Sequence, residues 1–277
     1  MEFSIITINY NNKSGLQRTI GSVLCQTWKN YEWIIIDGGS TDGSKELIEQ
    51  YQQHFAYWCS ERDRGVYHAM NKGISKATGE YLNFMNSGDA FNDENVLQKI
   101  NDLHSDADII WGQAVGMTNQ KIQNVYCGNL FIQLYKSTLC HQGTFIRRAL
   151  LLQYPYDEAL RIVSDWKFWL QTIVFGQARV ERTEIVIARY EGGGISSAST
   201  PESKALFKNE REGILGSFFP KLLRDEIDEY VRLRRSPYIV YGDYLQKSNH
   251  MLFAIGWRII KLLSLLDKYM SKCFLHK

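Results

Sequence analysis

The sequence predicts an α/β protein with a mostly parallel, Rossmann-like β-sheet flanked by helices. Two observations lead to this prediction: short β-branched runs alternate with segments of helical periodicity, and only a few residues connect them. Two strands joined through a helix almost always form a right-handed crossover between parallel neighbours. Ligands of such a sheet bind at the carboxyl ends of its strands.

The alternation continues to residue 111 and then becomes less regular. Expected strands are residues 3–8, 31–36, 57–58, 81–85 and 109–111, and expected helices are residues 16–24, 44–54, 66–77 and 94–103. Beyond them we expect an antiparallel hairpin at 121–126, a helix at 164–175, a strand at 178–190 and helical structure at 201–233. The segment Gly192–Ser196 is either a loop that closes on substrate or a plain surface turn.

The composition is typical of a globular protein, with 277 residues of which 44% are apolar and 22% charged. The net charge of +2 gives no argument for a nucleic-acid partner. The five cysteines are odd in number and scattered, so we expect reduced thiols in a cytoplasmic protein. The N-terminus predicts a strand instead of a signal peptide. Arg258 and Lys261 interrupt the apolar run near the C-terminus, so a membrane crossing is not expected.

Acidic residues stand at the predicted strand ends where many nucleotide-binding proteins carry glycines. Neither GxGxxG after the first strand nor GxxxxGK[ST] occurs, so the usual backbone cradles for pyrophosphate are missing. Asp37, Asp63 and Asp89 follow predicted strands instead. Carboxylates at one rim of a sheet bind either hydroxyl and ring N–H groups or a hard divalent cation.

Three stretches of the chain stand out in combination: SIITINYNN, SVLCQTWKNYEWIIIDGGSTDGS and ERDRGVYHAMNKGISKATGEYLNFMNSGD. Together they resemble the nucleotide-binding half of family 2 glycosyltransferases with the GT-A fold. CHQGTFIRR and VSDWKFWL resemble its acceptor-side segments, particularly in bacterial enzymes that build exopolysaccharide, capsule or O-antigen. The resemblance implies a nucleotide-sugar-binding half at residues 1–112, an acceptor-side half at 113–198 and a helical C-terminal extension at 199–277.

The resemblance also implies a set of donor contacts. Thr7 and Asn9 would line the base and ribose pocket, and Asp37 would bind the uracil ring, although Asp37 equally suits a turn former. Asp63 and Arg64, with Asn71 on the following helix, would approach the donor, whereas exposed charges are ordinarily just solvated.

Asn86-Ser87-Gly88-Asp89 stands at the position of the family's DxD motif, which holds Mn²⁺ or Mg²⁺ on the donor diphosphate. The first acid of that motif is absent here. Because such ions commonly use one or two carboxylates with phosphates and waters, Asp89 alone can serve as the metal ligand. Ser87 would contact the donor, and a helix-capping role for Asp89 is the alternative.

By the same resemblance, Asp165 is the catalytic base that takes the proton of the acceptor hydroxyl. An Asp in the first turn of a helix is also favoured by the helix dipole in any protein. His141 and Gln142 would contact the diphosphate or the acceptor, whereas a lone His is often structural.

The sequence therefore predicts an inverting glycosyltransferase that moves a sugar from a UDP-type donor to a glycan or lipid-linked glycan acceptor in cell-surface polysaccharide synthesis. The alternatives are a catalytically weak sugar-nucleotide or glycan-binding scaffold and a nucleotidyltransferase. The segment 251–270 carries an apolar face and basic residues. It suits peripheral contact with the inner face of the cell membrane, packing on the domain, or a homo-oligomer contact.

Overall fold

The computed structural model describes residues 2–118, 120–123, 128–192 and 200–234, and residues 254, 255, 258 and 261. The chain divides into two compact units, Met1–Ile214 and Leu215–Lys277. Residues 193–196 of the expected loop lie outside the described residues. Of the expected interfacial segment 251–270, the structure describes only residues 254, 255, 258 and 261. Within the described ranges, no helix combines the length and apolar character that a bilayer crossing requires.

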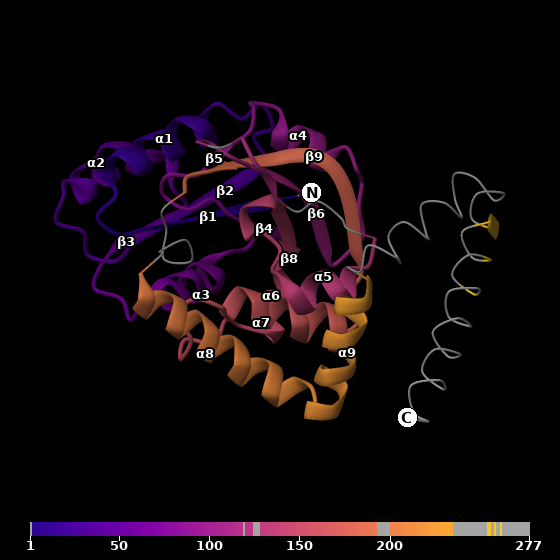
Figure 1. Ribbon diagram of the computed structural model, residues 1–277. Coiled ribbons are helices and arrows are strands. Elements are labelled where there is room, and N and C mark those ends of the chain that lie inside the picture. Colours follow the sequence, from indigo (N-terminus) through magenta and orange to yellow (C-terminus); the bar gives the residue numbers. More distant parts are fainter. Residues whose placement is uncertain are drawn as a thin grey trace, which may run out of the picture. The chain divides into compact units, whose positions relative to one another are not determined.

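The first unit is built on a single curved sheet whose strand order is β3-β2-β1-β4-β8-β6-β9-β5, with β7 beside β6 (Figure 1). Four parallel strands form its first half: β1 (Phe3–Asn9), β2 (Tyr31–Asp37), β3 (Tyr57–Ser60) and β4 (Tyr81–Phe84). The expected parallel arrangement of these strands is confirmed.

The second half of the sheet is mixed. β8 (Thr144–Arg147) lies antiparallel between β4 and β6 (Ile109–Gly116), so β6 does not follow β4 directly. β9 (Val180–Tyr190) pairs parallel with β6. The short strands β5 (Ala90–Phe91) and β7 (Ile122–Gln123) are antiparallel to β9 and β6 respectively. The β6–β7 pair is the hairpin expected near residue 121.

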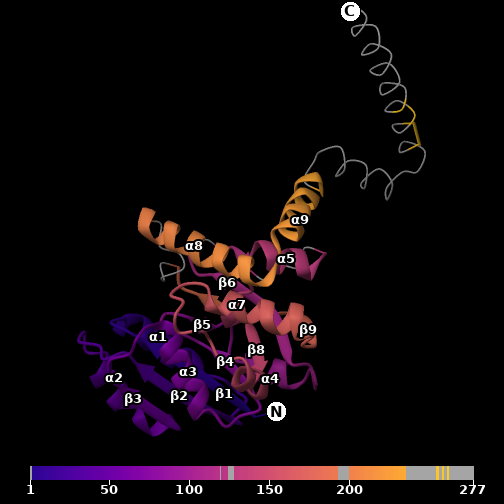
Figure 2. The same cartoon turned by 90° about the horizontal axis from the view of Figure 1, so that it is seen from below.

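Helices cover both faces of the sheet (Figures 1 and 2). One face carries α1 (Lys13–Leu24), α2 (Ser44–Tyr51) with the 3₁₀ turn η1 (Gln52–His54), and α4 (Val96–Asn101). The other carries α3 (Val66–Lys76), α5 (Leu130–Lys136), α6 (Arg148–Gln153) and α7 (Ser164–Trp169), which continues as the π-helical turn η3 (Leu170–Phe175). The remaining elements are the 3₁₀ turn η2 (His141–Gly143), α8 (Pro201–Phe218) and α9 (Lys221–Arg234).

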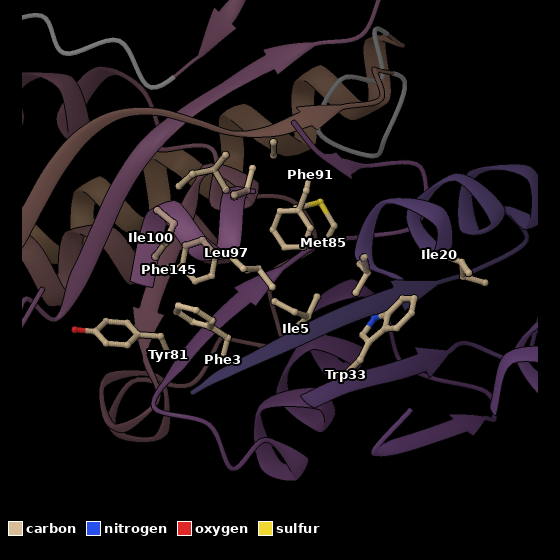
Figure 3. Close-up of a cluster of buried hydrophobic side chains, with 14 of the residues drawn as sticks. Phe3, Ile5, Ile20, Trp33, Tyr81, Met85, Phe91, Leu97, Ile100 and Phe145 are labelled. Carbon is tan, nitrogen blue, oxygen red and sulfur yellow. The ribbon is translucent and has the colours of Figure 1, made fainter. Parts of the chain in front are cut away.

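The alternation of side chains along β1 assigns each residue to one face of the sheet. Phe3 and Ile5 point into the core beneath α1, α2 and α4, where Figure 3 places them with Trp33, Leu97 and Phe145. Ile6 points to the opposite face, toward α3. Because both faces are covered, every residue of β1 is buried.

Gly73 allows α3 to lie directly on β1. A Cβ atom at this position would stand only 2.5 Å from Cγ2 of Ile6. By contrast, a Cβ at Gly21 on the exposed side of α1 would meet no atom within 4 Å. The two helical glycines therefore differ in packing and share the same low helix propensity.

Gly73→Ala should lower the free energy of unfolding by about 1–3 kcal/mol, because overpacking outweighs the gain in helix propensity. Gly21→Ala, the matched control, should raise it by about 0.5–1 kcal/mol. Urea unfolding followed by circular dichroism measures both changes. Equal stabilisation by the two substitutions would contradict the close packing of α3 on β1.

Candidate active site

The polar loops after β1, β2 and β4 meet at one rim of the sheet. Asn9 and Asp37 are register partners at the ends of β1 and β2. On the other side of β1, the Ser87 N–H donates to the carbonyl of Ile8 at 3.0 Å. The segment Asn86–Asp89 therefore lies next to the end of β1, as the parallel arrangement requires.

Asp37 is completely buried and its carboxylate is saturated with hydrogen bonds. It accepts from Asn9 Nδ2 at 2.7 Å, from Ser60 Oγ at 2.6 Å, from the Gly39 N–H at 3.2 Å, and from the hydroxyl and N–H of Ser40 at 2.6 and 2.9 Å. Burial alone would raise the pKa of Asp37, but these hydrogen bonds hold it below its ordinary value. Asp37 thus shapes the loop, and a uracil ring could bind it only by displacing one of these donors.

Thr7 and Asn71 have internal partners instead of facing the rim. The buried Thr7 hydroxyl donates to the carbonyl of Met85 at 2.7 Å and accepts from Trp33 Nε1 at 3.0 Å. The Asn71 amide bonds both backbone groups of Tyr156, at 2.8 and 3.0 Å. The donor contacts expected of Thr7 and Asn71 stay predictions, although these polar atoms already have partners inside the fold.

Asp63 and Tyr10 flank Gly38 at the rim. An added Cβ at Gly38 would lie 2.7 Å from Asp63 Oδ2 and 3.1 Å from Cδ2 of the Tyr10 ring. Asp63 Oδ1 accepts from the Gly65 N–H at 2.9 Å, while Tyr10 is 67% exposed. The Arg64 guanidinium is largely exposed and pairs with Glu158 at 2.5 Å, so its phosphate contact stays a prediction.

Asp89 is 5% exposed and lies between η2 and the residue that follows β9. Its Oδ2 accepts from Gln142 Nε2 at 2.8 Å, and its Oδ1 accepts from the Glu191 N–H at 2.9 Å. Burial raises the pKa of Asp89 to about 6, although both hydrogen bonds oppose the rise. Among the described residues, no cationic group is bonded to this carboxylate, so its ionisation carries a desolvation penalty.

The loop before Asp89 is closed by Arg18 and Glu191. Arg18 Nη1 donates to the Gly88 carbonyl at 3.0 Å and pairs with Glu191 Oε1 at 2.9 Å. Gly88 has a φ of 103°, and an added Cβ would collide with Glu191 Oε2. Ser87 is fixed through its backbone, whose carbonyl accepts from Asn12 Nδ2 at 3.1 Å.

Asp165, in the first turn of α7, lies beside His141. The distance from Asp165 Oδ2 to His141 Nδ1 is 3.6 Å, and Asp165 Oδ1 accepts from the Tyr67 hydroxyl at 3.1 Å. On its other side, His141 Nε2 lies 3.1 Å from Asn86 Nδ2. Because His141 and Gln142 are consecutive, the turn η2 connects Asp165 with the loop that carries Asp89.

α8 fixes the segment that leads into α7. Glu210 accepts hydrogen bonds from the backbone N–H groups of Arg161 and Ile162, at 2.7 and 3.0 Å. The next residue of α8 is Arg211, whose guanidinium lies 3.9 Å from the centre of the Trp166 ring. These contacts hold Trp166, the neighbour of Asp165, in place.

The structure thus brings Asp89, His141, Gln142 and Asp165 together, with Asp37, Asn9 and Asp63 further along the same rim. Sequence reasoning missed Tyr10, Tyr67, Arg18 and Glu191. An exposed aromatic residue in a polar loop could have pointed to Tyr10, but nothing in the pattern marks the other three. Within the described ranges, no group of three or more His, Cys, Asp or Glu side chains is arranged to hold a metal ion.

Comparisons with known proteins agree with this geometry. The family model "Glycosyl transferase family 2" matches residues 4–147. The chain is 32% identical over 209 residues to an uncharacterized glycosyltransferase of Mycobacterium tuberculosis, covering 72% of this chain and 79% of that protein. It is 29% identical over 206 residues to a PGL/p-HBAD biosynthesis glycosyltransferase of Mycobacterium bovis, covering 70% and 79%.

Solved structures share the fold at low sequence identity. Residues 1–349 of S. aureus TarS in complex with UDP-GlcNAc superpose with a TM-score of 0.63 at 19% identity, covering 82% of this chain and 70% of that chain. A mannosyltransferase of Pyrobaculum calidifontis with GDP-Man and Mn²⁺ gives 0.54 at 12% identity, covering 89% and 84%. The fold is that of the GT-A glycosyltransferases. The chain belongs to glycosyl transferase family 2.

The raised pKa of Asp89 predicts how its ionisation changes stability. Between about pH 4 and pH 6 the folded chain keeps a proton that the unfolded chain releases, so the free energy of unfolding falls as the pH rises. Asp89→Asn removes this effect. Relative to the wild type, it should gain on the order of 2 kcal/mol between pH 4.5 and pH 7.5, at about 1.4 kcal/mol per pH unit.

Urea unfolding at both pH values, without divalent cations, measures this difference. Asp102→Asn, at an exposed position, is the matched control and should show no comparable change with pH. A pH-independent difference between wild type and Asp89→Asn would show that ionised Asp89 carries no such penalty.

Proposed function

We propose that the protein transfers a sugar from a UDP-sugar to an acceptor hydroxyl with inversion at the anomeric carbon. The observation that carries the proposal is the bridge through η2: Gln142 bonds Asp89 at 2.8 Å, and the preceding His141 lies 3.6 Å from Asp165. A residue suited to the diphosphate side and a residue suited to base catalysis therefore lie on opposite sides of one turn. Residues 1–112 would hold the donor and residues 113–198 the acceptor.

The nucleotide would bind at the rim beside Gly38. The exposed Tyr10 ring can stack on a base, and Asp63 Oδ2 accepts no hydrogen bond from the described residues. A carboxylate oxygen is a good acceptor for the imide N–H of uracil. Asn9 Oδ1, which is buried without a partner in the described part of the chain, and Ser87 would add donor contacts. The complexes of TarS with UDP-GlcNAc and of the mannosyltransferase with GDP-Man support a nucleotide-sugar donor.

A divalent cation, Mn²⁺ or Mg²⁺, fits the residues at Asp89. This carboxylate is buried without a cationic hydrogen-bond donor, and Glu191 supplies a second carboxylate nearby. Ions of this type take their remaining ligands from phosphate and water. When bound, the ion would stabilise the negative charge that develops on the departing diphosphate. The Mn²⁺ in the mannosyltransferase complex is consistent with this proposal.

Asp165 would act as the general base. Its carboxylate would take the proton of the acceptor hydroxyl while the hydroxyl oxygen forms a bond to the anomeric carbon. The bond from that carbon to the diphosphate oxygen breaks on the opposite side, and the nucleoside diphosphate leaves. One displacement inverts the anomeric configuration, so no covalent glycosyl-enzyme forms.

The acceptor would be a glycan or a lipid-linked glycan of the cell surface. The relative named for PGL/p-HBAD biosynthesis supports an acceptor outside central metabolism. The basic and apolar residues of segment 251–270 would suit peripheral contact with the cytoplasmic face of the membrane or a contact between copies of the chain.

A sugar-nucleotide or glycan-binding scaffold with weak catalysis is the second candidate. Asn86 favours it, because an amide stands where the family motif carries its first acid. Both the transferase and the scaffold would bind the donor, but only the transferase would turn it over efficiently.

Donor binding tests the nucleotide and metal assignments. UDP with Mn²⁺ should raise the melting temperature of the wild type more than UDP alone, because a ligand that binds only the folded state stabilises it. Asp89→Asn should lose the Mn²⁺-dependent part, while Tyr10→Ala should weaken the shift with or without Mn²⁺. Asp102→Asn again serves as control. An unchanged Mn²⁺ effect in Asp89→Asn would remove this residue from the metal site.

Turnover tests the base. Asp165→Asn should reduce turnover by roughly 10²–10⁴-fold, the contribution typical of general base catalysis, and leave donor affinity within a few-fold. Release of UDP from a set of UDP-sugars and glycan acceptors measures turnover, and calorimetry measures affinity. Full activity of the variant would refute the base assignment. A wild type that binds donor and neither hydrolyses nor transfers it would favour the scaffold.

A further inference from the structure

A chain of polar contacts connects the loop of Asp89 to Asp165 through groups that the reaction itself does not consume. It runs from Asn86 Nδ2 to His141 Nε2 at 3.1 Å, from His141 Nδ1 to Asp165 Oδ2 at 3.6 Å, and from Asp165 Oδ1 to the Tyr67 hydroxyl at 3.1 Å. We propose that Asn86, His141 and Tyr67 are positioning residues that orient the carboxylate of Asp165. The inference rests on the proposed function, which gives Asp165 the role of base.

Asn86 determines which nitrogen of His141 carries the proton. The Asn86 amide nitrogen can only donate, so His141 Nε2 is the acceptor in this contact and the ring N–H lies at Nδ1. That N–H faces Asp165 Oδ2. The separation of 3.6 Å is longer than a hydrogen bond, and catalytic hydrogen bonds are often long without substrate and shorten when it binds.

Asn86 occupies the position where the family motif has an acid, and an acid would reverse this arrangement. A carboxylate at position 86 would accept a proton from Nε2 and favour the opposite tautomer or the imidazolium. In this proposal, the amide of Asn86 keeps the N–H at His141 Nδ1 directed at Asp165, the proposed base.

Tyr67 holds the other oxygen of the carboxylate. Its buried hydroxyl lies 2.7 Å from the carbonyl of Ile162 and 3.1 Å from Asp165 Oδ1. Burial and the negative charge of Asp165 keep the pKa of Tyr67 well above its ordinary value, so the hydroxyl remains a donor. With His141 facing Oδ2, the two oxygens of Asp165 are approached from η2 and from α3.

Aromatic rings limit how far the imidazole can turn. Phe84 meets the His141 ring edge to face with centroids 6.4 Å apart, and Tyr156 lies 5.7 Å from Phe84. The acidic groups around His141 are Asp165 from α7 and Asp89 from the loop after β4, while burial and the charge of Asp165 raise the pKa of Tyr67 and of Tyr156. A base held in this way keeps its free lone pair directed at the acceptor hydroxyl, which raises the rate through orientation.

Two substitutions of His141 separate orientation from bulk structure. His141→Asn keeps an N–H close to the position of Nδ1, and His141→Ala removes it. We expect His141→Ala to lower kcat roughly 10–10²-fold with the donor KM within a few-fold, and His141→Asn to recover kcat to within about fivefold of wild type. His54→Ala, at an exposed position, is the control. Equal losses in both His141 variants, or a loss confined to the donor KM, would overturn the proposal.

Ring nitrogen chemical shifts of the histidines provide a readout that needs no activity. In the wild-type protein at neutral pH without donor, the His141 signal, identified by its absence in His141→Asn, should report the Nδ1–H tautomer. Asn86→Asp should convert it to the Nε2–H or doubly protonated form. A wild-type Nε2–H tautomer would mean that the Asn86 carbonyl faces the ring, and it would overturn the proposal.

These shifts also separate this inference from the proposed function. An Nδ1–H tautomer in a protein that transfers no sugar would refute the transferase and support the arrangement around Asp165. Transfer activity together with an Nε2–H tautomer would support the transferase and refute the arrangement around Asp165.

Discussion

The geometry of the site depends on how the short turn η2 is held against β4. The buried side chain of Asn83, in β4, donates from Nδ2 to the carbonyls of Gln142 and Thr144 at 3.1 and 2.9 Å. The Thr144 hydroxyl donates back to the carbonyl of His141 at 2.7 Å. These bonds fix the backbone of two consecutive residues whose side chains point to different acids. They therefore help to keep the side chains that contact Asp89 and Asp165 at a constant separation.

Two buried carboxylates at the rim differ in their surroundings, and the difference separates their roles. Neutral donors surround both oxygens of Asp37 and hold its pKa below the ordinary value, so it is ionised and structurally committed. Asp89 has fewer donors for a similar degree of burial, and its pKa rises to about 6. A carboxylate that is costly to ionise alone gains most from a cation, because the cation removes the penalty. The surroundings of Asp37 suit it to holding its loop in place. The surroundings of Asp89 suit it to the cation binding proposed above.

The features that could be predicted from the sequence are those that leave a pattern in neighbouring residues. The strands β1 and β2 were predictable from their β-branched runs, and β3 and β4 from short runs with aromatic residues that alternate with segments of helical periodicity. β8 has four residues and no clear period, so its insertion between β4 and β6 could be found only from tertiary pairing. The internal hydrogen bonds of Thr7 and Asn71 were not predictable for a related reason, since a sequence does not show which side chains find partners inside the fold. Resemblance pointed to His141 and Asp165, but the hydroxyl of Tyr67, which meets Asp165, lies 98 positions away from it in the sequence.

The amide at Asn86 also affects the electrostatic balance of the site. Asp89 and Glu191 already place two carboxylates near the segment Asn86–Asp89, and among the described residues Arg18 pairs with Glu191. A further acid at position 86 would add a like charge close to Asp89 and make its ionisation costlier still. The neutral amide avoids this repulsion, and at the proposed metal site a diphosphate oxygen or water would take the place of the missing acid. Under this proposal, the departure from the family motif favours a site that would take up its cation together with the donor, instead of one that holds the cation beforehand.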